Sequence, residues 1–89
     1  MIRETVMIKN KLGLHARAAA KFVTTCSAFA SRIAVGRDQN MVDGKSIMSV
    51  MMLAANQGTE LTLEIDGHDE VQALLALKTL IDDFFGEGG

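Results

Sequence analysis

The stretch ELTLEID, residues 60–66, alternates polar and apolar side chains over its whole length. Successive side chains of a β-strand point to opposite faces, so this pattern predicts a strand that buries Leu61, Leu63 and Ile65. The polar residues between them predict an outer face in contact with water. A strand of this kind is typical of an antiparallel sheet that is covered on one face only.

Three more strands are predicted on either side of this stretch. Residues 2–9 also alternate polar and apolar side chains. Ile33 and Val35 alternate with smaller or polar residues, and Met41 and Val42 follow a polar turn at residues 38–40. Two short apolar runs separated by a polar turn predict a β-hairpin.

Helical periodicity appears in three other places. Residues 16–27 carry one apolar stripe, formed by Ala19, Phe22, Val23 and Cys26. Residues 46–55 form a short and unusually apolar helix. Asp69 and Gln72 resemble a capping box, after which an apolar stripe continues until Gly86. That stripe consists of Ala73, Leu77, Leu80 and Phe84.

The element order is therefore βαββαβα, within a single domain that spans residues 1–89. An antiparallel sheet with helices on one face and water on the other buries every apolar face, which gives an α+β fold. A ferredoxin-like domain has a compatible element order, so the strand order stays open at this point.

Composition excludes several classes of function. The formal net charge of −2 disfavours a nucleic-acid-binding protein, which needs a basic surface. Cys26 is the only cysteine, and only His15 and His68 could join it, so we expect no disulfide and no metal site. We expect His68, in a polar turn, to be solvated and Cys26 to be a small buried apolar residue.

The sequence also allows a prediction of where in the cell the protein is located. The sequence lacks an apolar run long enough to span a bilayer, so we expect no membrane insertion. Residues 1–9 lack the basic head and apolar core of a secretion signal. We therefore expect a cytoplasmic protein.

The segment NKLGLHAR, residues 10–17, places His15 between a glycine-containing loop and the first turn of a helix. The first N–H groups of a helix lack internal partners, so an anion such as a phosphoryl group on His15 would find donors there. Arg17 adds a charged fork that can pair with phosphate oxygens. The alternative is that His15 merely flanks the helix and that Arg17 is a solvated charge.

Two segments together favour the functional interpretation. GLHAR, residues 13–17, and GKSIMSVM, residues 44–51, resemble the signature segments of the HPr family of histidine-containing phosphocarriers. The resemblance implies an open-faced β-sandwich of four antiparallel strands under three helices. It also implies that His15 accepts a phosphoryl group through Nδ1 from enzyme I and passes it to an enzyme IIA domain, with Arg17 stabilising the phosphate.

The resemblance further implies that the carrier holds no cofactor, and that magnesium and phosphoenolpyruvate serve enzyme I upstream. One departure is Ala18, where the family usually has proline. Alanine is also a good helix former in a first turn, so we expect the site to tolerate it. Sequential docking to such partners is compatible with a monomer.

The helix at residues 46–55 has two apolar sides. Val50, Leu53 and Ala54 cluster on one, and a separate arc is formed by Ile47, Met48, Met51 and Met52. Methionines often fill core gaps, but a flexible methionine surface also suits docking to several partners. The resemblance implies that this arc, together with Ala16, contacts partner enzymes.

Ser46 begins the same helix, where its simplest role is an N-cap. The resemblance adds a second role for Ser46, as the site on which a regulatory serine kinase/phosphorylase acts, with transfer through His15 reduced when Ser46 is phosphorylated. Phosphate there would place a dianion beside the docking arc.

A second hypothesis is a non-catalytic binding module of ferredoxin-like type. An RNA-binding module needs aromatic side chains on its strands, but this chain has no Trp or Tyr, and its phenylalanines fall in or beside predicted helices. A copper carrier needs paired cysteines, and this chain has a single cysteine, which excludes that class of binding module. A regulatory domain for a small ligand stays open, as does the choice between sugar uptake and regulation.

Overall fold

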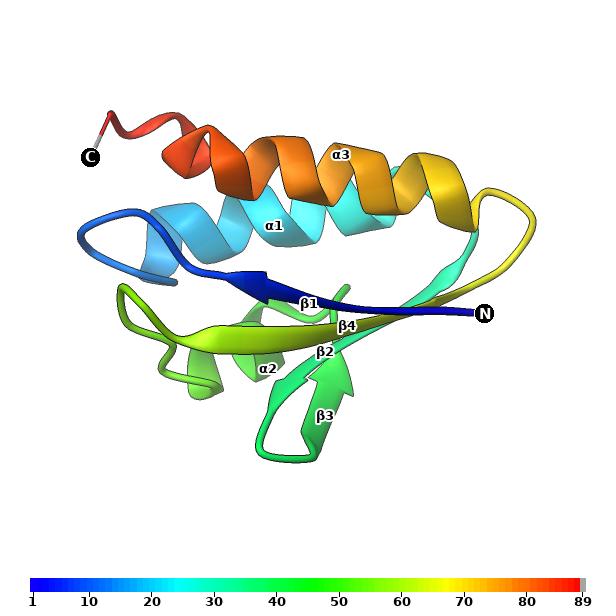
Figure 1. Ribbon diagram of the computed structural model, residues 1–89, viewed down its shortest axis with the longest axis horizontal. Helices are drawn as coiled ribbons and strands as arrows, with labels where there is room; N and C mark the ends of the chain where they lie inside the picture. The colour runs from blue at the N-terminus through cyan, green and yellow to red at the C-terminus, as the bar shows by residue number, and fades with distance from the viewer. Residues whose placement is uncertain (89) are drawn as a thin grey trace.

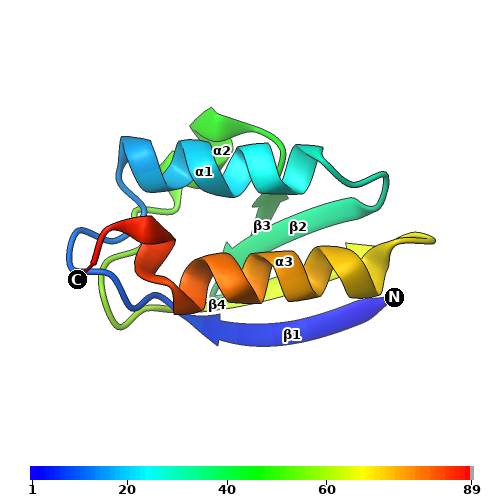
Figure 2. The same ribbon diagram turned by 90° about the horizontal axis from the view of Figure 1, so that it is seen from above.

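Four strands form one antiparallel sheet in the order β1-β4-β2-β3 in the computed structural model, which describes residues 1–88. The strands are β1 (Ile2–Met7), β2 (Arg32–Arg37), β3 (Asn40–Asp43) and β4 (Glu60–Asp66). The helices are α1 (Ala16–Ser27), α2 (Ile47–Met52), α3 (Glu70–Asp82) and the short 3-10 helix η1 (Phe84–Gly86). Figures 1 and 2 show α1 and α3 side by side across one face of the sheet, with α2 next to α1. The predicted open-faced α+β fold is confirmed, and the strand order that the sequence left open is settled.

Strand β4 lies in the middle of the sheet, between β1 and β2. Ile65 is paired with Ile2 of β1 on one side and with Ile33 of β2 on the other. Leu61, Leu63 and Ile65 are all buried under the helices. Burial of a side chain of this size contributes about 1.5–3 kcal/mol, so these residues anchor the core.

The predicted hairpin joins β2 and β3 through Asp38 and Gln39. Both residues have positive φ, 51° and 69°, as a two-residue turn of type I′ requires. Asn40, expected in the turn, already belongs to β3. Strand β1 is shorter than predicted and ends at Met7, but Ile8 remains buried and its amide donates to the Thr59 carbonyl at 3.0 Å.

Helix α1 has the predicted bounds and buries most of its predicted stripe. Ala19, Phe22 and Cys26 are buried, whereas Val23 is only partly buried and packs against the edge of the core. Cys26 is therefore the small buried residue that was expected.

The predicted capping box at the start of α3 is wrong. The Asp69 side chain makes no cap hydrogen bond and instead accepts from the backbone N–H groups of Ala30 at 2.8 Å and Ser31 at 3.0 Å, and from the Ser31 hydroxyl. The carboxylate of Glu70 accepts from the amide of Gly67 at 3.1 Å. Asp69 thus ties the turn before β2 to the start of α3.

The end of α3 also differs from the prediction. The helix ends at Asp82 rather than at Gly86, and Phe84 and Phe85 have positive φ, 59° and 53°. This turn buries Phe85 and leaves Phe84 only partly buried, which reverses the expected order. The buried stripe of the segment consists of Ala73, Leu77, Ile81 and Phe85.

Helix α2 ends earlier than the apolar pattern predicted. Val50 and Leu53 face the core as expected, but the helix stops at Met52 and Ala54 has a φ of 51°. Ala54 is consequently exposed, and Ala55 is buried in its place.

Candidate functional site

His15 is the N-cap residue of α1, as the sequence predicted. Its backbone is extended, with φ −70° and ψ 178°, and its carbonyl accepts the amide of Ala19 at 2.8 Å. Its side chain is 29% exposed, which leaves the ring partly open to solvent. The Nδ1 atom faces the start of the helix and accepts a long hydrogen bond, 3.4 Å, from the backbone N–H of Arg17.

The loop before His15 is held against the segment that follows α2. Leu14 is buried, and its amide donates to the Ala55 carbonyl at 2.9 Å. Gly13 has a φ of 69°, and a Cβ built on it would lie 2.4 Å from the same carbonyl oxygen. Only glycine fits this position, so the two residues together fix where His15 begins the helix.

The other ring nitrogen of His15 is paired with a residue 72 positions away. Nε2 contacts the carboxylate of Glu87, whose side chain is only 10% exposed. The second carboxylate oxygen accepts from Nδ2 of the buried Asn10 at 2.9 Å, and the same Nδ2 donates to the Gly13 carbonyl at 2.8 Å. Figures 1 and 2 show the C-terminal segment beside the loop that leads into α1.

These contacts assign the hydrogens of the imidazole. A backbone N–H only donates, so Nδ1 presents its lone pair to Arg17. An ionised carboxylate only accepts, so Nε2 carries the ring hydrogen toward Glu87. The hydrogen bond from Asn10 is the largest of the effects that hold the pKa of the Glu87 carboxyl below its usual value, and the contact with His15 acts in the same direction. The lone pair that could act as a nucleophile is therefore on Nδ1, where only the long hydrogen bond from Arg17 meets it.

Sequence reasoning did not identify Asn10 or Glu87. Asn10 is the first residue of the segment at residues 10–17, but no function was predicted for it, and Glu87 lies beyond the last predicted helix. One signal was available for Asn10, since a polar residue so close to a candidate active histidine is a natural second partner.

Arg17 is exposed on the first turn of α1. Within residues 1–88 its guanidinium makes no hydrogen bond or ion pair, so its charge is free for an incoming anion. Ala18, where the family usually has proline, is fully buried in the same turn and lies within a regular helix.

The predicted arc on α2 is exposed. We call Ile47, Met48, Met51 and Met52 the apolar patch, and their exposed fractions are 40%, 68%, 38% and 80%. Ala16 is exposed at the start of the neighbouring helix α1 (Figure 2). Ser46 caps α2, because its Oγ accepts the amide of Ser49 at 3.4 Å, so the predicted cap is confirmed.

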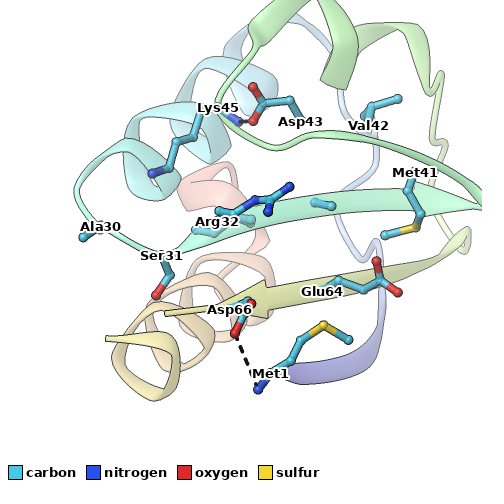
Figure 3. Close-up of a pocket in the computed structure, with 12 residues that line it drawn as sticks. Met1, Ala30, Ser31, Arg32, Met41, Val42, Asp43, Lys45, Glu64 and Asp66 are labelled. Atoms are coloured by element: carbon cyan, nitrogen blue, oxygen red, sulfur yellow. Dashed lines mark hydrogen bonds and ion pairs between the residues drawn. The ribbon is translucent and has the colours of Figure 1, made fainter. Parts of the chain in front are cut away.

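A hollow of about 690 Å³ lies elsewhere, on the face of the sheet that the helices leave uncovered (Figure 3). Arg32, Glu64 and Asp66 line it with the Met1 end of the chain, and His15 is not among its lining residues. His68 is exposed, as expected. No helix among residues 1–88 has the length and apolar character needed to cross a membrane. The same residues contain no group of three or more His, Cys, Asp and Glu side chains arranged to hold a metal ion.

Comparison with known proteins decides the family. Residues 2–83 match the family described as the PTS HPr component phosphorylation site. The chain is 52% identical to the phosphocarrier protein HPr of Neisseria meningitidis serogroup A over 88 residues, which is 99% of each chain. The chain belongs to the HPr family.

Relatives and solved structures agree with this assignment. The HPr of Pseudomonas aeruginosa is 55% identical over 84 residues, 93% of each chain. The crystal structure of HPr-C-His from Thermoanaerobacter tengcongensis is 49% identical, covers 98% of both chains and superposes with a TM-score of 0.94. The function of this HPr-family chain is that of a phosphocarrier of the phosphotransferase system, and the binding-module hypothesis is set aside.

Proposed function

We propose that His15 is the phosphoryl acceptor of this phosphocarrier and that the reacting atom is Nδ1. The observation that carries the proposal is the placement of a partly exposed imidazole at the N-cap of α1, with its Nδ1 lone pair toward the helix. A neutral imidazole nitrogen is a good nucleophile for phosphoryl transfer when the product anion is stabilised.

The transfer step needs only the donor and this ring. The Nδ1 lone pair attacks phosphorus, an N–P bond forms, and the bond between phosphorus and the donor breaks with its electron pair going to the donor. The phosphoryl oxygens can then accept hydrogen bonds from the backbone N–H of Arg17, which points at Nδ1 in the unphosphorylated protein. The other unpaired N–H groups of the first turn of the helix can donate to them as well. The exposed guanidinium of Arg17 supplies the remaining positive charge.

The partners follow from the family. A phosphorylated enzyme I is the donor and an enzyme IIA domain is the acceptor, while magnesium and phosphoenolpyruvate act on enzyme I. The apolar patch and Ala16 support docking, because they are exposed on neighbouring helices at the same end of α1 as His15. A cytoplasmic monomer fits a carrier that must release one partner before it binds the next.

Ser46 is a candidate regulatory site on the same surface. It precedes Ile47 and Met48 of the apolar patch and is only partly buried. A phosphate on its hydroxyl would add about two negative charges next to apolar contacts that have to be desolvated on docking. Phosphorylation of Ser46 would therefore weaken partner binding without any chemical change at His15.

The test is intact mass after incubation with enzyme I of the same organism, magnesium and phosphoenolpyruvate. We expect one phosphoryl adduct that is labile in acid and stable in alkali, and that is absent from His15→Ala. Arg17→Ala should form the same adduct more slowly. An adduct that persists in His15→Ala would place the acceptor elsewhere, and the absence of any adduct on the wild type would remove the proposal.

A further inference from the structure

The contact between His15 and Glu87 is built from several sides. Phe85 is fully buried, and its carbonyl accepts from Nζ of Lys21 at 2.6 Å, which fixes the chain just before Glu87. The Glu87 carboxylate then uses one oxygen for Asn10 at 2.9 Å and the other for Nε2 of His15. A side chain that is 10% exposed and held in this way has a defined position, unlike an exposed acid near a chain end.

The chemistry of the ring gives this position a purpose. When Nδ1 of a neutral imidazole bonds to phosphorus, both nitrogens carry substituents and the ring becomes positively charged. The ring hydrogen stays on Nε2, facing the carboxylate. When the phosphoryl group leaves, the electron pair of the N–P bond returns to Nδ1 and the ring is neutral again. A carboxylate that orients an imidazole and stabilises its charged form has the same part in hydrolases that use a histidine with an aspartate.

We propose that Glu87 is a positioning residue for phosphoryl transfer through His15. It holds the hydrogen on Nε2, aims Nδ1 at the incoming phosphorus, and stabilises the positive ring of the phosphorylated form. Asn10 supports it by fixing the carboxylate. The inference deepens the proposed function, since it rests on His15 as the acceptor.

The experiment combines nitrogen-15 NMR of the His15 ring with the rate of phosphoryl acceptance from enzyme I. The full chain is compared with Glu87→Gln, which keeps the length of the side chain, and with Glu87→Ala. Asp83→Asn is the matched control, because it removes one negative charge from the same segment and its side chain has no hydrogen bond or ion pair within residues 1–88.

We expect a downfield, slowly exchanging Nε2 hydrogen in the wild type and in Asp83→Asn. Both Glu87 variants should lose that signal and accept phosphate at least about tenfold more slowly, the lower end of the loss seen when the hydrogen-bond partner of a functional histidine is removed. Unchanged backbone spectra in all variants would show that the fold is intact.

Two results would overturn the inference. One is an Nε2 hydrogen signal that persists in the Glu87 variants, because Glu87 would then not be the group that holds this hydrogen. The other is loss of the signal with an unchanged rate, because the contact would then be structural only. Failure of the proposed function is separate, since it would appear as a wild type that accepts no phosphate.

Discussion

Gly13 lies so close to Ala55 that a Cβ on the glycine would be 2.4 Å from the alanine carbonyl oxygen. The same carbonyl accepts the amide of Leu14, so the approach is part of the loop that delivers His15. Gly58 also has positive φ, 87°, but nothing lies within 4 Å of the corresponding Cβ position. The two glycines therefore separate backbone strain from steric clash.

Gly13→Ala should lower the free energy of unfolding by more than Gly58→Ala does. Positive φ alone costs an alanine about 1–2 kcal/mol, and the clash at Gly13 adds at least about 1 kcal/mol more. Urea unfolding of both variants measures the difference. Phosphoryl acceptance should fall for Gly13→Ala only, and equal effects of the two substitutions would contradict the argument.

The double variant Met48→Ser and Met52→Ser should raise the KM for phosphorylated enzyme I about tenfold, with little change in kcat. The two side chains are 68% and 80% exposed, so their loss should leave the fold intact. Met7→Ser, an exposed methionine of β1 outside the apolar patch, is the control. A KM that rises equally in the control would argue against the apolar patch as the docking surface.

Ser46→Asp and Ser46→Ala should have opposite effects. Aspartate is a good N-cap, so Ser46→Asp should keep the stability of α2 but slow phosphoryl acceptance by placing charge beside the apolar patch. Ser46→Ala should lose about 1 kcal/mol of stability with the cap and transfer at nearly the normal rate. Thermal unfolding and the transfer assay read the two effects, and normal transfer by Ser46→Asp would rule out the electrostatic explanation.

Asp69 should make the stability of the protein depend on pH in the acid range. Hydrogen bonds from the Ser31 hydroxyl and then from the Ala30 amide lower its pKa from 3.8 to about 2. The stabilisation is therefore complete above pH 3.8 and is lost as the pH falls toward about 2. The Tm difference between wild type and Asp69→Asn should be large at pH 7 and shrink at pH 2, whereas a constant difference would refute the linkage.

Cys26 should be inert in the folded protein. Burial raises the pKa of its thiol to about 12, so little thiolate exists near neutral pH. Ellman's reagent at pH 8 should label it about a hundredfold more slowly in buffer than in urea. Rapid labelling of the folded chain would mean that α1 opens far more often than its buried face suggests.

Local patterns predicted the parts of the molecule that depend on local physics. The alternation at residues 60–66 predicted a strand with one buried face, and the loop-to-helix transition predicted His15 at a helix start. Ser46 was predicted as a cap for the same reason. Each of these features is set by residues within a few positions of one another, so a single sequence contains the information.

The features that were missed or wrong depend on pairs that are distant in the sequence. Asp69 left the expected capping box because Ser31 offers it better donors from across the fold. Glu87 reaches His15 only after the chain turns at Phe84 and Phe85, where positive φ breaks the helical pattern. The periodicity of a sequence contains no information about contacts between residues that are so far apart along the chain.

The strand order has a consequence for how the chain acquires its structure. Strand β1 has one neighbour, β4, and their pairing joins Ile2 to Ile65. During synthesis the backbone of β1 therefore stays unpaired until residues 60–66 have left the ribosome. Pairings so distant along the chain also slow folding, because a long loop has to close before they form. Nascent chains that stop before β4 would lack the centre of the sheet and should stay unfolded.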